Sequence, residues 1–274
     1  MSPRDRLGAR AGRLLAGSGE PIFRLLPERV LANLRRRGSE NALVWNLMYP
    51  LAHSGLSLHR WLAIRPLWGT AGTQGPDEIL WPYFWGWSVD GRRLEALDDC
   101  LDRLDGPGLQ TEVDLFLLGA STLVLIEAKH LAAAGRCGRY LRRRCPEIHP
   151  EALDTGETCR YWTQPGAQFS LALEFGPRPM AGGQAPPCAR HYQLGRTLLL
   201  GLLLSERLGR TLHVWLVLPR RRWRGMETAW LDFTERVRDA DLWRHMRVLA
   251  WEDVAALPRP RETARGNHTS TYSR

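Results

Sequence analysis

The chain has 274 residues, 44% of them hydrophobic and 24% charged, and this balance excludes the intrinsically disordered and fibrous classes. The formal net charge is +9 and the pI is about 9.9, which favours polyanionic partners, nucleic acid first. Arginine enrichment from a high-GC genome explains the same surplus equally well.

The sequence lacks the features of a secreted or membrane-spanning protein. Its first forty residues carry charges throughout, without the apolar core of a signal peptide. The longest apolar run, at 198–204, is too short to cross a bilayer. We therefore expect a cytoplasmic protein with no membrane partner, whose five cysteines stay reduced.

The N-terminal part reads as a basic helical segment over 1–38, followed by one domain over 39–257. Ser39 is typical of a helix N-cap, and apolar spacing predicts a helix from Glu40 to about His53. The polar stretch 258–274 is predicted to be a disordered tail.

The middle of the chain alternates strand and helix patterns. A strand is predicted near Ile79–Trp87 and a helix over 92–104. Two apolar runs, 111–119 and 121–130, flank small residues and predict a β-hairpin. Because both runs are almost continuously apolar, we expect their strands to be buried on both faces of a sheet.

Residues 135–188 show no periodicity and are interpreted as an insertion rather than a core element. A helix is predicted over 189–208, ended by Gly209, and a buried strand over 211–218. Arg220–Arg224 are interpreted as a basic loop that either grips phosphates, with Trp223 stacked on a base, or is simply solvated.

A helix near Glu227–Asp239 and a last element over 246–257 complete the chain. The order of helices and strands predicts an α/β fold with helices on a mixed sheet.

The predicted hairpin carries an unusual set of charged residues. With a turn over 119–122, Asp114 lies opposite Glu127, and Lys129 shares the face of Glu127. Two carboxylates at that distance repel each other unless a cation lies between them. Mg²⁺ prefers such oxygen ligands, and Lys129 could orient an attacking water.

Lys129 is the single lysine among the 38 basic Lys and Arg residues. A compact ammonium and a planar guanidinium are not interchangeable. The exception suggests a task that arginine cannot perform.

This pattern resembles the PD-(D/E)XK nuclease superfamily, in which an Asp on one strand precedes a Glu-x-Lys on the next. No proline precedes Asp114, where the family is loose. The resemblance covers roughly residues 39–220 and implies a restriction-endonuclease-like sheet flanked by helices. It also implies that Asp114 and Glu127 bind Mg²⁺ or Mn²⁺ and that Lys129 serves the attacking water. By the same resemblance Glu40 binds metal-coordinated water and Gln193 completes the catalytic set.

Four of the five cysteines lie in the insertion: Cys137, Cys145, Cys159 and Cys188. Four thiolates, or thiolates with His149, suit Zn²⁺, and four thiolates also suit an iron–sulfur cluster. Their spacings match no CxxC template, so the alternative is that they act as small buried hydrophobes. Cys100 lies in a helical pattern and is expected in the core.

Together these features predict a Mg²⁺-dependent nuclease, an endonuclease or exonuclease acting on nucleic acid, DNA in the first instance. The alternative is a non-catalytic nucleic-acid-binding or assembly module that keeps the fold. The sequence itself does not separate DNA from RNA.

Overall fold

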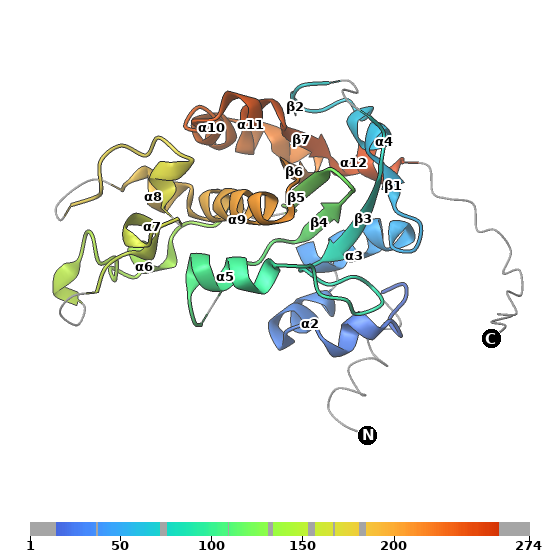
Figure 1. Cartoon of the computed structure of the whole chain (residues 1–274), viewed down its shortest axis with the longest axis horizontal. Helices are drawn as coiled ribbons and strands as arrows, with labels where there is room; N and C mark the ends of the chain where they lie inside the picture. The colour runs from blue at the N-terminus through green and yellow to red at the C-terminus, as the bar shows by residue number, and fades with distance from the viewer. Residues whose placement is uncertain are drawn as a thin grey trace, which may run out of the picture.

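A mixed seven-stranded β-sheet with helices on both faces forms the centre of the molecule (Figure 1). The computed structural model describes residues 15–36, 38–71, 76–108, 110–130, 134–152, 157–166, 168–180 and 185–257. Within these residues no helix is long and apolar enough to cross a membrane.

The strands run in the spatial order β1-β3-β4-β5-β6-β7-β2. Their bounds are β1 (Leu56–Ser57), β2 (Trp68–Gly69), β3 (Ile79–Phe84), β4 (Leu115–Leu118), β5 (Thr122–Ala128), β6 (Thr211–Leu218) and β7 (Met246–Ala250). Strands β5, β6 and β7 are parallel to one another, and every other neighbouring pair is antiparallel.

The helices differ widely in length, and the longest follows the insertion. The α-helices are α2 (Glu28–Leu34), α3 (Glu40–Met48), α4 (Leu58–Leu62), α5 (Leu97–Asp105), α6 (Gly138–Leu141), α7 (Arg160–Thr163), α8 (Pro187–Arg190), α9 (Tyr192–Leu208), α10 (Trp223–Thr234), α11 (Ala240–Arg244) and α12 (Trp251–Ala255). Short 3₁₀ turns are η1 (Pro21–Arg24), η2 (Tyr49–Leu51), η3 (Pro150–Ala152), η4 (Phe169–Leu171) and η5 (Arg220–Arg222).

The central strands are buried on both faces, as their apolar sequence predicts. Leu123 and Leu125 of β5 belong to a core formed with α5, α9 and α10. Val124 and Ile126 belong to a second core, which includes residues of α2, α3 and α4. Alternation along each strand therefore divides the interior into two layers.

The local cues at the two best-predicted helices are confirmed. The Ser39 hydroxyl accepts the N–H of Ala42 at 3.1 Å and caps α3. Gly209 ends α9 with φ at +62°, a conformation that glycine adopts without a Cβ penalty. Helix α3 is shorter than predicted, because Pro50 shifts the chain into η2.

The hairpin has the predicted register. Leu115 pairs with Ile126 and Leu118 pairs with Leu123, which places Asp114, just before β4, opposite Glu127. The predicted strand at 211–218 is confirmed as β6 over the same residues.

Two interpretations are wrong. The basic stretch from Arg220 is η5 and the start of α10, where Trp223 packs against the core instead of projecting from a loop. The insertion also contributes to the core, because Phe169, Leu173 and Phe175 are buried there. Short irregular turns bring these side chains inward without any helical or strand periodicity.

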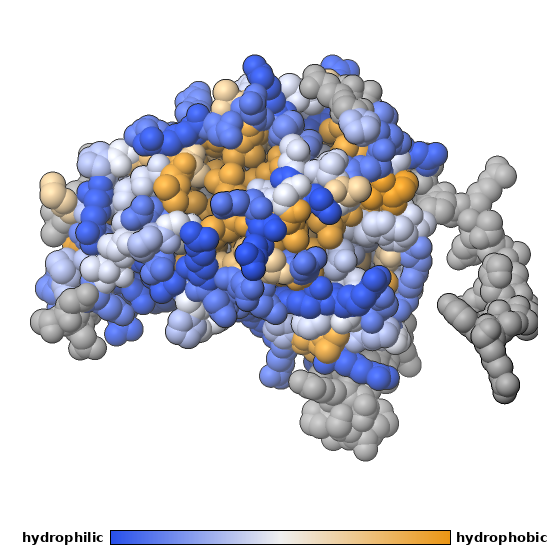
Figure 2. All heavy atoms as spheres, in the orientation of Figure 1, coloured by the Kyte–Doolittle hydropathy of each residue, from blue (hydrophilic) through white to orange (hydrophobic). Residues whose placement is uncertain are grey.

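Helix α2 is part of the second core, to which it contributes Val30 and Leu34. The predicted tail 258–274 lies outside the described residues. On the face shown in Figure 2, hydrophobic residues are visible mainly in the middle, surrounded by hydrophilic ones.

Candidate functional site

Asp114 and Glu127 meet where β4 begins and β5 ends. The Asp114 Oδ2 atom accepts the backbone N–H of Ala128 at 2.8 Å, which turns this carboxylate toward β5. Glu127 is one residue earlier on the same strand, and its side chain is 2% exposed. The hairpin register therefore brings the half-buried carboxyl group of Asp114 together with the buried one of Glu127.

The two carboxyl groups strongly affect each other. Burial, together with the negative charge of Glu127, raises the pKa of Asp114 to about 8. Burial also raises the pKa of Glu127, against the opposing effect of Lys129. The Glu127 Oε2 atom is buried and has no hydrogen-bond partner among the described residues. The negative charges of the two carboxyl groups are therefore incompletely neutralised, and Glu127 Oε2 lacks a hydrogen-bond donor.

Lys129 supplies the nearest positive charge. Its Nζ atom lies 2.6 Å from Glu127 Oε1 and 3.7 Å from Glu40 Oε2, and its side chain is 7% exposed. Burial alone would lower the pKa of Lys129, but the carboxylates of Glu127 and Asp114 outweigh burial and raise it. The backbone is also held, because the Trp251 indole donates to the Lys129 carbonyl at 2.9 Å.

Glu40 reaches this cluster from the first turn of α3. Its Oε1 atom accepts the backbone N–H of His130 at 2.9 Å, while Oε2 faces the Lys129 amino group. Because Ser39 caps the helix at this point, the capped terminus positions Glu40 against the end of β5.

Gln193 completes the group from the N-terminal turn of α9. Its side-chain amide donates to Glu127 Oε1, and its Oε1 atom accepts the N–H of Gly135 at 2.6 Å. The side chain therefore ties the strand bearing Glu127 to the loop beyond it. All five residues expected from the sequence meet at one place.

A cavity of about 190 Å³ adjoins Lys129. It is lined by Lys129, His130, Leu218, Arg221, Arg222, Gly225 and Met226. The run of arginines after β6 lies beside Lys129 because β5 and β6 are paired in parallel, so that both strands end at the same edge of the sheet. This pairing joins distant parts of the chain, and no local sequence pattern indicates it.

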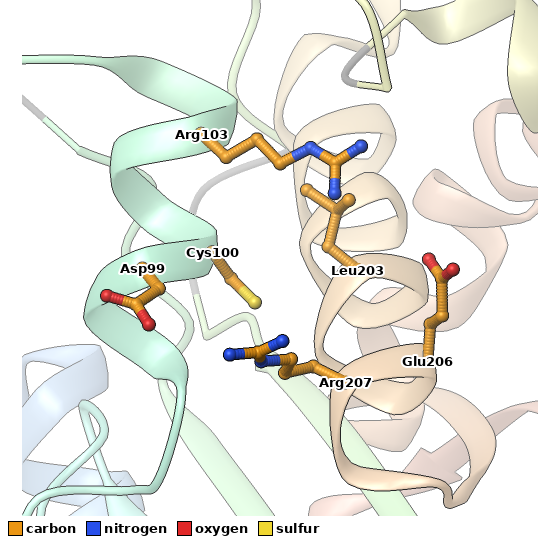
Figure 3. Close-up of a pocket in the computed structure, with 6 residues that line it drawn as sticks. All are labelled: Asp99, Cys100, Arg103, Leu203, Glu206 and Arg207. Carbon is orange, nitrogen blue, oxygen red and sulfur yellow. The ribbon is translucent and has the colours of Figure 1, made fainter.

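A larger cavity, of about 400 Å³, lies between α5 and α9 and is shown in Figure 3. Its lining combines Asp99 and Glu206 with Arg103 and Arg207, around the Cys100 thiol. None of the residues expected to be catalytic lines it. Cys100 itself is 6% exposed and belongs to the core, as expected.

The four cysteines of the insertion occupy the starts of short turns. Cys137 and Cys159 precede α6 and α7, Cys188 lies in α8, and Cys145 begins the turn that leads to Ile148. None of them forms a disulfide. Among the described residues, no group of three or more His, Cys, Asp or Glu side chains is already arranged to hold a metal ion.

In comparisons with protein-family models, with curated proteins and with solved structures, the chain shows no match.

Proposed function

We propose that the chain is a metal-dependent nuclease of the PD-(D/E)XK type, acting on DNA, with Asp114, Glu127 and Lys129 at its active site. The observation that carries this proposal is the acidic pair of buried Glu127 and half-buried Asp114, with Lys129 against Glu127. Glu127 contacts Lys129 at 2.6 Å yet keeps one buried oxygen without a partner. A buried polar atom without a partner is costly, so a site that keeps one is suited to a ligand.

The acidic pair fits a divalent cation. Asp114 and Glu127 offer hard oxygen atoms from facing strands, and each carboxylate is destabilised by burial. When bound there, Mg²⁺ or Mn²⁺ would offset negative charge on a phosphodiester and make a water molecule more acidic. The residues that would hold the cation are Asp114 and Glu127.

Lys129 and Glu40 would act on the water and the phosphate. The Lys129 amino group is held between Glu127 and Glu40, so its position is fixed before substrate arrives. From there it would orient the attacking water or offset charge that develops on the phosphate. Glu40 also contacts Lys129 and would bind a metal-coordinated water, as the resemblance implies, while Gln193 holds Glu127.

The surroundings favour a phosphate-containing polymer as substrate. The net charge is +9, and the cavity beside Lys129 is lined by Arg221 and Arg222. The order α3, β3, β4, β5, α9, β6 also follows the order of elements that the resemblance implies, and on this basis we propose a restriction-endonuclease-like core.

The test is cleavage of single-stranded and duplex DNA, circular DNA and RNA by the purified chain with Mg²⁺, Mn²⁺ or chelator. We expect metal-dependent cleavage that Asp114→Asn and Glu127→Gln each reduce by about 100-fold or more. Unchanged cleavage in either variant would contradict the assignment.

The matched control is Glu112→Gln. Glu112 is another partly buried carboxylate two residues from Asp114, but it is paired with Arg29 at 2.9 Å, and burial raises its pKa. This variant should keep most of the activity. If the wild-type chain binds nucleic acid and cleaves none of these substrates, the non-catalytic binding module is the correct reading.

A further inference from the structure

A third cavity, of about 250 Å³, lies next to Asp114, since Val113 is in its wall. The other walls come from the turn after β3 and from α5. Helix α2, which contributes Arg29, lies beside α5 in Figure 1. Cavities for drug-sized ligands occupy about 300–1,000 Å³, so this one suits a smaller, compact group.

The turn after β3 has an unusual residue at its tip. Phe84 and Trp87 exchange two backbone hydrogen bonds, at 2.7 and 2.9 Å, across Trp85 and Gly86. Both central residues have positive φ, +49° and +82°, a conformation that glycine, asparagine or aspartate ordinarily adopts in such turns. A bulky residue there is costly, and its presence indicates that the indole of Trp85 is needed at this place.

Trp85 joins this turn to the candidate site. Its backbone N–H donates to the Asp114 carbonyl at 3.2 Å, and its side chain lines the cavity. Its carbonyl accepts from Arg93 at 3.1 Å, and the Arg93 guanidinium lies 4.9 Å from the centre of the Trp87 ring. The turn that carries the indole is therefore fixed relative to Asp114.

Two residues of the cavity wall have polar side-chain atoms without partners. Trp85 Nε1 and Thr111 Oγ1 are buried and form no hydrogen bond within the described part of the chain. The Thr111 backbone is held, because its N–H donates to the Asp105 carboxylate, but its hydroxyl is not satisfied. Buried polar atoms without partners are costly, and a ligand in the cavity with acceptor atoms on its edge would supply both partners.

Apolar side chains form much of the remaining wall. They are Leu25, Leu97, Leu101, Val113 and Phe116. Leu25 is 42% exposed, which is unusual for a large hydrophobic residue of this chain. A ligand with apolar surfaces would therefore find contacts on several sides.

The charged residues of the wall that can form ion pairs are already paired with one another. Arg29 lies 2.9 Å from Glu112, and Arg93 lies 2.5 Å from Asp98. None of these four residues is assigned a contact with the ligand. Among the described residues that line this cavity, no cation is left over for a phosphate, so a neutral group fits it better.

We propose that this cavity binds an unpaired nucleobase of the substrate strand, next to the phosphate on which Asp114, Glu127 and Lys129 would act. The inference rests on the proposed function, from which it takes the nature of the substrate. A nucleobase is planar, with apolar faces and with acceptor atoms on its edge. Proteins bind unpaired bases by contacts of aromatic and apolar side chains with the faces and by hydrogen bonds to the edge.

Trp85 and Thr111 would bind the edge of the base, and the apolar wall would contact its faces. A base that is paired within a duplex cannot enter such a cavity without leaving its partner. The substrate class is therefore a nucleic acid strand with an unpaired base at the site.

The first measurement compares two ligands with the wild-type chain. Fluorescence anisotropy in chelator measures the binding of a short labelled single-stranded DNA, and of a strand of the same length made of abasic residues. We expect the strand with bases to bind about 10-fold more tightly or better. Equal affinity for the two strands would overturn the proposal without any variant.

Thr111→Val tests the cavity itself, because valine keeps the shape of threonine and removes the hydroxyl. This variant should bind the base-containing strand about 5-fold more weakly and the abasic strand as the wild type does. Its Tm should not fall, since the hydroxyl has no partner in the ligand-free chain. A merely structural role for Thr111 would lower the Tm and leave the preference for bases unchanged.

Thr197→Val is the matched control. The Thr197 hydroxyl is also buried without a partner among the described residues, but it lies on α9 and does not line this cavity. Thr197→Val should bind both strands as the wild type does. If Thr111→Val and Thr197→Val bind the base-containing strand equally well, the cavity does not bind the base.

This proposal and the proposed nuclease activity fail separately. A chain that cleaves DNA but binds both strands equally would lose the base-binding cavity and keep the nuclease assignment. A chain that prefers the base-containing strand, loses this preference in Thr111→Val and cleaves nothing would keep the cavity and contradict the nuclease.

Discussion

At the scale of single residues, the main feature is a carboxylate shared by two donors. Glu127 Oε1 accepts from both Lys129 and Gln193, while its Oε2 atom has no partner among the described residues. Two donors on one oxygen fix the orientation of the carboxyl group. The other oxygen is thereby held in one place, without a donor of its own among the described residues.

Lys129→Arg should reduce cleavage by about 100-fold, although it preserves charge. The Lys129 amino group contacts both Glu127 and Glu40 with 7% of its side chain exposed, and a planar guanidinium would place its donors differently from a compact ammonium. Cleavage rates of Lys129→Arg and Lys129→Ala should be measured together with DNA binding. Near-wild-type turnover by the arginine variant would show that the compact ammonium is not needed.

Asp114 should make the metal-free protein less stable as pH rises. Its ordinary pKa is 3.8 and its folded pKa is about 8, so between these values the folded state holds a proton that the unfolded state has lost. The free energy of unfolding contributed by this group therefore falls as pH rises through that window. Thermal unfolding with chelator should give a falling Tm between pH 5 and 8.

Asp114→Asn is the control for that measurement, because the amide does not titrate. Its Tm should depend less on pH than the wild type, and Mg²⁺ should raise the wild-type Tm most at the alkaline end. The same slope in both proteins would show that Asp114 is ionised in the folded, metal-free chain.

At the scale of elements, Arg247 joins β7 to the end of α4. Its guanidinium is 1% exposed and donates to the carbonyls of Trp61, Leu62 and Ile64 at 2.7 to 3.1 Å. Burial lowers the pKa of Arg247 to about 10, still well above neutral pH. A cation at the C-terminal end of a helix is well placed, because the last carbonyls there lack partners.

Arg247→Ala should lower the free energy of unfolding by about 3 kcal/mol, since it removes three hydrogen bonds to buried carbonyls, of which the Trp61 carbonyl keeps another donor, the Ile64 N–H. Arg244→Ala, three residues earlier, removes an exposed ion pair with Asp241 and should cost less than about 0.5 kcal/mol. Denaturant unfolding of both variants measures the difference. Equal effects would mean that Arg247 does not hold α4.

Elements defined by local patterns were predictable from the sequence. The hairpin register follows from two apolar runs around small residues, and β6 follows from one apolar run that ends at Pro219. These patterns also placed Asp114 opposite Glu127. Gly209 and Ser39 ended and began their helices as their backbone chemistry predicts.

Features that depend on distant parts of the chain were not predictable. Arg247 finds its partners more than 180 residues away, and nothing near it in sequence indicates them. Phe169 and Leu173 enter the core from irregular turns that have no periodicity. Gln193 is an ordinary helix residue in the sequence, and its place at the site was expected from the resemblance alone, not from any local pattern.

At the scale of the whole molecule, the arginines differ in whether a nearby carboxylate already neutralises their charge. Many arginines are already paired with acids, among them Arg220, which contacts Asp253 at 2.6 Å. Arg221 lines the cavity beside Lys129 and has no ion-pair partner in the part of the chain that the structure describes. Such an arginine is available to a phosphate, whereas a paired one must first give up its carboxylate.

Arg221→Gln should therefore weaken DNA binding more than Arg220→Gln, although both remove one charge from adjacent positions. Each phosphate contact releases counterions, so loss of one should reduce the slope of log affinity against log salt by about 1. Fluorescence anisotropy measures the binding of short duplexes over a range of salt concentrations and so gives this slope. Chelator in the buffer prevents cleavage during the measurement. If the two variants bind equally well, only the total charge matters, and the cavity beside Lys129 does not position the substrate.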